Sequence, residues 1–116
     1  MRKTLTALLL CAASTAWAGP RDPEWNPPAA YDHPYRGELH LHRVPVGQVD
    51  EACIALYQRE GKPTSWRWEV TASQHGCAVR KATSCEVIIP LGPILRAPPS
   101  AVLRHEVGHC NGWSHK

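Results

Sequence analysis

The sequence predicts a small α+β domain: a short, mostly antiparallel sheet with one upstream helix and a C-terminal helix. The chain has 116 residues, a length that suits one domain. Strand-like alternation is present at 38–44 and 66–71, and two further short strands are predicted at 77–80 and 85–90. Apolar residues follow helical spacing in two further segments, at 48–60 and 101–111.

The first strand is predicted from the segment ELHLHRV at 38–44. Leu39 and Leu41 share one face of it, and His40 and His42 share the other, because successive strand side chains alternate. The two histidines could together bind a metal ion, separately from the motif near the end of the chain, or one of them could donate a hydrogen bond to a transition state. A simple polar strand face is the favoured interpretation.

The first helix is predicted at 48–60, where Val49, Cys53 and Leu56 follow helical spacing. Gly61 stands where a glycine can end a helix. The later strands follow the alternation in WRWEVT at 66–71, then a turn at 74–76, and a hairpin of 77–80 with 85–90. If the strand at 85–90 forms a sheet edge, it would bind an extended peptide by strand addition; otherwise it is an apolar core strand.

The domain organisation begins with a predicted secretory signal at 1–18. A basic start precedes an apolar run, and Ala16-Trp17-Ala18 offers the small residues that a signal peptidase recognises, so cleavage is expected after Ala18. The run is too short for a stable membrane anchor. Residues 19–36 hold five prolines and predict an extended arm, with a loose tail as the alternative, and residues 37–116 form the folded domain. We therefore expect a secreted or periplasmic protein with a bacterial type of signal.

Composition excludes one large class of partner. The chain has 13 basic and 10 acidic residues with no basic stripe, so nucleic-acid binding is not expected. After signal removal four cysteines remain, and an even number in a small exported domain predicts two disulfides. We predict the pairs Cys53–Cys110, which would tie the metal helix to the body, and Cys77–Cys85 across the hairpin. A second, structural zinc on all four is the alternative.

The end of the chain, RHEVGHCNGWSHK, carries the chemistry. The last helix is predicted at 101–111, with Ser100 as its N-cap and Gly112 as its stop. His105 and His109 are four residues apart, so a helix places them one turn apart on the same face, where both can bind one Zn²⁺.

The remaining parts of the motif complete this site. Glu106 would lie beside the metal as a base for a water molecule. Catalytic zinc usually has three protein ligands, and the turn at Gly112 can return His115 to the same ion.

This HExxHxxGxxH string at 105–115 resembles the extended zinc motif of the metzincin metallopeptidases. The resemblance implies zinc held by His105, His109 and His115, with Glu106 as the catalytic base, in a minimal zincin-like domain. The methionine turn of that family has no counterpart, because Met1 is the only methionine and belongs to the predicted signal. The ending also resembles that of small exported bacterial proteins with an HExGHxNGW motif.

The sequence thus predicts an exported zinc metallopeptidase that acts on a peptide or protein substrate. One alternative is a zinc-binding envelope protein without catalysis, and another is a subunit completed by a partner chain or by a second copy of itself. Several residues are further candidates for oxyanion support: Tyr31, Tyr35, Tyr57 and Arg104. His33 and His75 fall in turn-like segments and are expected to be exposed to solvent.

Overall fold

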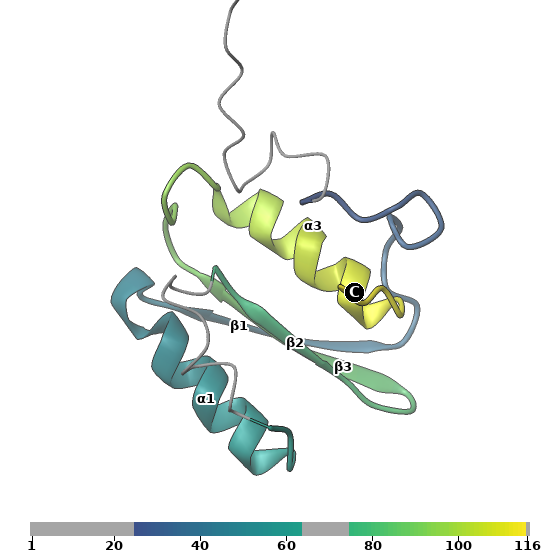
Figure 1. The fold of residues 1–116 in the computed structure, drawn as a ribbon, viewed down its shortest axis with the longest axis horizontal. Coiled ribbons are helices and arrows are strands. Elements are labelled where there is room, and N and C mark those ends of the chain that lie inside the picture. Colours follow the sequence, from purple (N-terminus) through teal and green to yellow (C-terminus); the bar gives the residue numbers. More distant parts are fainter. Residues whose placement is uncertain (1–24, 64–74, 116) are drawn as a thin grey trace, which may run out of the picture.

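The computed structural model describes residues 25–63 and 75–115 and confirms a small α+β domain (Figure 1). Its elements follow in chain order: β1 (Glu38–Val44), a 3₁₀ turn η1 (Val46–Gln48), α1 (Val49–Arg59), β2 (Cys77–Arg80), β3 (Ser84–Pro90) and α3 (Pro99–Cys110). The predicted signal at 1–18 and the predicted strand at 66–71 lie outside the described residues. None of the described helices is long and apolar enough to cross a membrane.

The sheet is mixed, with the strand order β1-β3-β2. β1 pairs with β3 in parallel, from Glu38 opposite Ser84 to Val44 opposite Pro90, whereas β2 pairs with β3 antiparallel. The expectation of a mostly antiparallel sheet was therefore wrong, because the longer of the two pairings is parallel. The chain leaves β1 through α1 before it re-enters the sheet, and such a crossover is what parallel pairing requires. The central place of β3 also excludes the hypothesis that 85–90 is a sheet edge.

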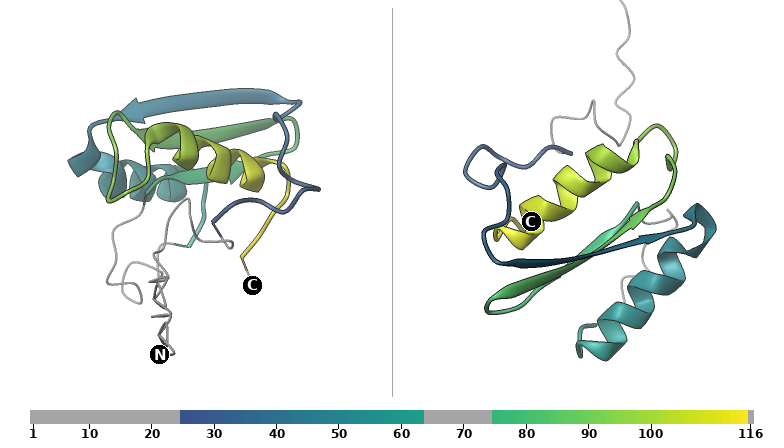
Figure 2. Two further views of the ribbon diagram at one scale, coloured as in Figure 1. Left: turned by 90° about the horizontal axis from the view of Figure 1, so that it is seen from above. Right: turned by 180° about the vertical axis from the view of Figure 1, so that it is seen from behind.

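The two helices pack on opposite faces of the sheet (Figures 1 and 2). Strand alternation explains how β3 serves both layers. Cys85, Val87 and Ile89 belong to the apolar cluster that includes Val102 of α3. Ile88 belongs instead to the cluster beneath α1. The domain is a three-layer arrangement with a thin core on each side of the sheet.

The disulfides join each helix to the sheet, and the predicted pairing was wrong. Cys53 of α1 bonds to Cys77 of β2, with their Cα atoms 5.9 Å apart. Cys85 of β3 bonds to Cys110 of α3, with a Cα–Cα distance of 5.7 Å. The predicted Cys53–Cys110 pair would have to cross the sheet, and Cys77 and Cys85 cannot pair because they belong to clusters on opposite faces. Two disulfides indicate an extracellular or otherwise oxidising environment.

The ends of the helices agree with the glycine signals but not with the predicted cap. Gly61 and Gly112 both have positive φ, at 65° and 106°, after the ends of α1 and α3. α3 begins at Pro99, with an extended Pro98 as its N-cap and no side-chain capping bond, so Ser100 lies inside the helix. A proline at the first helical position needs no backbone N–H, which explains the earlier start.

The described part of the Pro-rich segment, 25–36, runs along α3 before it enters β1 (Figure 1). Asn111 at the end of α3 donates from Nδ2 to the carbonyl oxygens of Tyr31 and His33, at 2.8 and 2.6 Å. Arg104 donates from Nε to Asp32 at 2.9 Å, and this ion pair holds the pKa of Asp32 below its usual value. We call residues 25–36 the arm, and its contacts place it beside the HExxHxxGxxH motif.

Candidate metal site

Helix α3 and the turn after it position three imidazoles. His105 and His109 lie one turn apart on α3, where i and i+4 side chains share a face. The backbone N–H groups of Gly112 and Trp113 bond to the carbonyls of His109 and Gly108, which closes the helix. At its φ of 106° Gly112 then reverses the chain, and His115 returns toward the two helical histidines.

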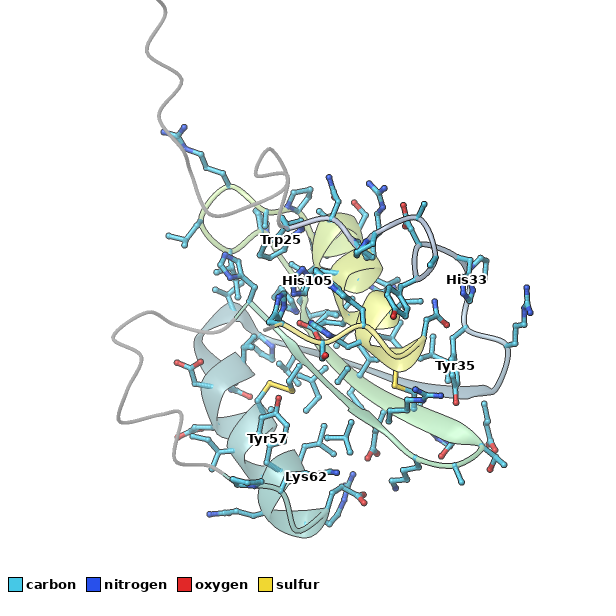
Figure 3. The ribbon with its side chains drawn as sticks, turned by 45° about the vertical axis from the view of Figure 1, so that its right-hand side comes forward. Trp25, His33, Tyr35, Tyr57, Lys62 and His105 are labelled. Atoms are coloured by element: carbon cyan, nitrogen blue, oxygen red, sulfur yellow. A yellow bond between two sulfur atoms is a disulfide. The ribbon has the colours of Figure 1, made fainter. Side chains whose placement is uncertain are left out.

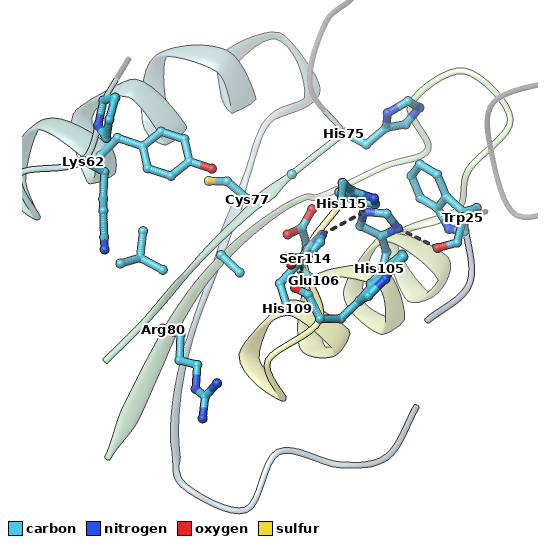
Figure 4. Close-up of a pocket in the computed structure, with 16 residues that line it drawn as sticks. Trp25, Lys62, His75, Cys77, Arg80, His105, Glu106, His109, Ser114 and His115 are labelled. Atoms are coloured by element: carbon cyan, nitrogen blue, oxygen red, sulfur yellow. Dashed lines mark hydrogen bonds between the residues drawn. The ribbon is translucent and has the colours of Figure 1, made fainter. Parts of the chain in front are cut away.

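The three histidines converge through their Nε2 atoms (Figure 4). Nε2 of His105 lies 3.2 Å from Nε2 of His109 and 3.2 Å from Nε2 of His115. All three donor atoms lie within 4.8 Å of one another. Ligands at roughly 2.0–2.1 Å around a tetrahedral zinc ion are about 3.3 Å apart, so the two distances from His105 fit such an ion. The predicted set is thus brought together into a group that could hold a metal ion.

Two backbone carbonyls orient the rings. Nδ1–H of His105 donates to the carbonyl oxygen of Trp25 at 2.6 Å, and Nδ1–H of His109 donates to that of Trp113 at 2.7 Å. With the proton on Nδ1, the lone pair of Nε2 faces the centre of the group, as metal ligation requires. The acceptor Trp25 comes from the arm, 80 positions before its partner, and no local sequence signal indicates this contact.

Aromatic packing and burial reinforce this arrangement. Trp113 stacks on His109 with an interplanar angle of 7°, and Trp25 lies over His105 with ring centroids 4.4 Å apart. Burial lowers the pKa of His105 to about 4 and also lowers that of His109. Both rings are therefore neutral near pH 7, the form that binds metals.

Glu106 lies next to the three histidines but is not one of the converging donors. Its side chain is only 5% exposed, and among the described residues none forms a hydrogen bond or ion pair with its carboxyl group. Burial raises the pKa of this carboxyl to about 8. Gly76 lies against this part of the site: an added Cβ would lie 2.6 Å from the carbonyl oxygen of Ile88 and 2.9 Å from Cγ1 of Val102, and in ordinary contact, at 3.5 Å, with Cγ of Glu106.

A cleft of about 720 Å³ opens onto the site and contains Glu106 and all three histidines in its walls (Figure 4). Strand β2 runs along one wall, and Trp25 of the arm and Trp113 contribute aromatic surface. β2 is an outer strand of the described sheet, so one of its edges is not paired with any described strand. Figure 3 shows His105 between Trp25 on one side and Tyr57 and Lys62 on the other.

No family model, curated protein or solved structure matches this chain. The site must therefore be interpreted from its own residues.

His75 is a site residue that the sequence reasoning missed. It was expected to be exposed, but its ring is half-buried and lines the same cleft, with its centroid 4.9 Å from that of Trp25. Its Nε2 atom is buried and has no hydrogen-bond partner in the part of the chain that the structure describes, and burial lowers the pKa of the ring. Only the pairing of β2 with β3 brings His75 close to α3, so the signal is not local.

The other candidates lie elsewhere or have other partners. His40 and His42 are exposed, and His42 bonds to Glu86 at 3.1 Å; neither belongs to a metal-binding group among the described residues. Arg104 is engaged with Asp32 of the arm. Of the three tyrosines considered, only Tyr57 lines the cleft.

Proposed function

We propose that this protein is an exported zinc-dependent metallopeptidase that hydrolyses peptide bonds. One observation carries the proposal: a buried carboxyl group without a described partner, that of Glu106, shares a cleft with three converging imidazoles. A purely structural metal site has no use for such a group, whereas metal-assisted hydrolysis needs a base beside the metal.

The residues present fit zinc. Three imidazoles suit a borderline-soft ion in tetrahedral coordination, and backbone carbonyls fix the tautomers of two of them, His105 and His109. Three protein ligands leave a fourth position open. Bound there, zinc would supply Lewis-acid chemistry that acidifies a water molecule and polarises the substrate carbonyl. The HExxHxxGxxH order and the turn at Gly112 favour a metzincin-like assignment of these roles.

The protein's own groups would have two tasks: Glu106 transfers a proton, and backbone carbonyls orient the imidazole rings of His105 and His109. Burial favours the protonated form of Glu106 in the metal-free cleft, and the positive charge of a bound zinc ion would lower the pKa again and favour the carboxylate. In that form Glu106 accepts a proton from the attacking water and afterwards delivers it to the leaving amine. The Trp25 and Trp113 carbonyls keep His105 and His109 in the tautomer that points Nε2 inward.

A peptide is the substrate class that the cleft favours. The outer edge of β2 pairs with none of the described strands, and its backbone donors and acceptors would serve an extended chain by strand addition. The aromatic walls from Trp25 and Trp113 would pack against its side chains. The disulfides agree with action outside the reducing cytosol.

The test compares the chain from Gly19 onward with its Glu106→Gln variant. We expect about one zinc per chain in both, measured by elemental analysis, and cleavage of a mixed peptide library by the unaltered protein only. A loss of at least about a hundredfold in the variant identifies Glu106 as the base. Zinc in both proteins without cleavage by either would favour a non-catalytic zinc-binding protein, or a site completed by a partner chain. Absence of zinc from both would refute the proposal.

A further inference from the structure

The charges around the cleft are unevenly distributed. Arg80 at the end of β2 and Lys62 after α1 both line it and are exposed. The only acidic residue among the described lining residues is Glu106, which is buried. The exposed charges that the described residues contribute to the cleft are therefore positive.

Neighbouring cations differ from these two, because acidic residues neutralise them. Lys81 pairs with Glu60 at 2.8 Å, and Arg59 pairs with Glu86. Arg80 and Lys62 form no ion pair with any described residue. No described acidic residue therefore neutralises these two charges, and they can attract an anionic ligand.

The two cations flank β2 from its two sides. The alternation of β2 places Arg80, opposite Cys85, on the α3 face, and its Nη1 atom would lie 2.9 Å from a Cβ added at Gly112. Lys62 follows α1, on the other face of the sheet. An extended chain along β2 presents alternate side chains to these two faces, so it can meet both cations.

We propose that the cleft selects peptides with acidic side chains, which Arg80 and Lys62 bind beside β2. This inference rests on the proposed peptidase function of the same cleft and names its substrate class. Gly76 marks the end of the β2 segment next to Glu106, and Arg80 lies four residues further along. A peptide along β2 would have its scissile bond next to Glu106 and would extend by roughly 3.3 Å per residue toward Arg80. Because the Arg80 side chain lies close to Gly112, we expect the acidic residue of the peptide about three positions from the scissile bond.

The two ends of the cleft differ in charge: Arg80 and Lys62 lie toward one end, and the aromatic Trp25 lies toward the other. Figure 4 shows Arg80 and Lys62 away from Trp25, with the histidines and Glu106 between them. A preferred peptide would thus carry its acidic residues on one side of the scissile bond only. Guanidinium–carboxylate contacts are charge-assisted and exposed, and we expect about a five- to tenfold preference at low salt.

The test measures binding, so that it does not depend on hydrolysis. Zinc-loaded Glu106→Gln protein is titrated with two pools of end-blocked fluorescent decapeptides. The pools share one random composition, except that one contains Glu where the other contains Gln. We expect about five- to tenfold tighter binding of the Glu pool at low salt, with a smaller difference in 0.5 M salt because of screening.

Arg80→Gln should remove most of this difference, and Lys62→Gln a smaller part. Lys81→Gln is the matched control, because Lys81 is adjacent in sequence but paired with Glu60 and not part of the cleft wall. Equal affinity for the two pools, binding of neither, or an unchanged preference in Arg80→Gln would overturn the inference. If the Glu pool is preferred as described but the unaltered protein cleaves no peptide, the proposed peptidase function fails while this inference stands.

Discussion

Replacement of Gly108 by alanine should have two opposing effects on stability: a gain from the higher helix propensity of alanine, and a loss from a steric clash between α3 and the arm. In an exposed helix this change stabilises by about 1 kcal/mol. Here an added Cβ would lie 2.5 Å from Cγ and 2.8 Å from Cβ of Pro27, and 3.1 Å from Cε3 of Trp113. The proline ring cannot rotate away as a flexible side chain would, so the arm must move.

Overpacking of this kind costs about 1–3 kcal/mol, so the expected net effect on the free energy of unfolding is a loss of about 0–2 kcal/mol. The larger effect should fall on the metal. Displacement of the arm removes the Trp25 carbonyl from Nδ1 of His105, and loss of such an outer partner lowers metal affinity about 10- to 100-fold.

Urea unfolding of the metal-free protein and competition for zinc with a fluorescent chelator measure the two effects. Gly47→Ala is the control, because nothing lies within 4 Å of the Cβ it would add. Pro27→Gly combined with Gly108→Ala should relieve the overlap and recover part of the stability. A stabilised Gly108→Ala protein with unchanged zinc affinity would refute the packing of the arm on α3.

Three further predictions concern covalent links, the turn and pH. Peptide mapping without reduction should show Cys53–Cys77 and Cys85–Cys110, and removal of the second bond, which spans 25 positions, should cost about 3 kcal/mol of unfolding free energy. Gly112→Ala should strain the backbone by about 1–3 kcal/mol and weaken zinc binding, measured by chelator competition; unchanged affinity would contradict the role of this turn. The pKa of Asp32 is lowered in the folded state, so its stabilising effect should be present above about pH 4 and lost as the pH falls further. The difference in unfolding free energy between the unaltered protein and Asp32→Asn should shrink accordingly, and a difference independent of pH would argue against the ion pair with Arg104.

The parts of this molecule that could be predicted are those encoded locally. The helix at 48–60 and the strand at 38–44 follow from periodicity, and α1 and β1 have nearly these bounds. The metal group lies within eleven residues, so a helix and one glycine turn are enough to assemble it.

The predictions that were wrong concern how the two helices and the sheet pack on one another. The predicted bond between Cys53 and Cys110 assumed two helices on the same side of the sheet, and nothing in the periodicity of either helix specifies its face. The parallel pairing of β1 with β3, which accompanies the separation of the helices, joins residues more than 40 positions apart. The approach of Trp25 and His75 to the site is likewise a tertiary contact, invisible to a local pattern.

The disulfide connectivity has a consequence for how the chain matures. The bonds join the first cysteine after the predicted signal to the second, and the third to the fourth, in two loops that neither overlap nor enclose one another. Such a chain enters an oxidising compartment with its amino end first. After Cys53 the next cysteine to emerge is its native partner Cys77, and after Cys85 the next is its native partner Cys110. An oxidase acting in order of emergence therefore produces the native bonds, without the reshuffling that a nested pattern would demand. The disulfide that fixes α3 to the sheet is formed last, when Cys110 emerges, only a few residues before His115.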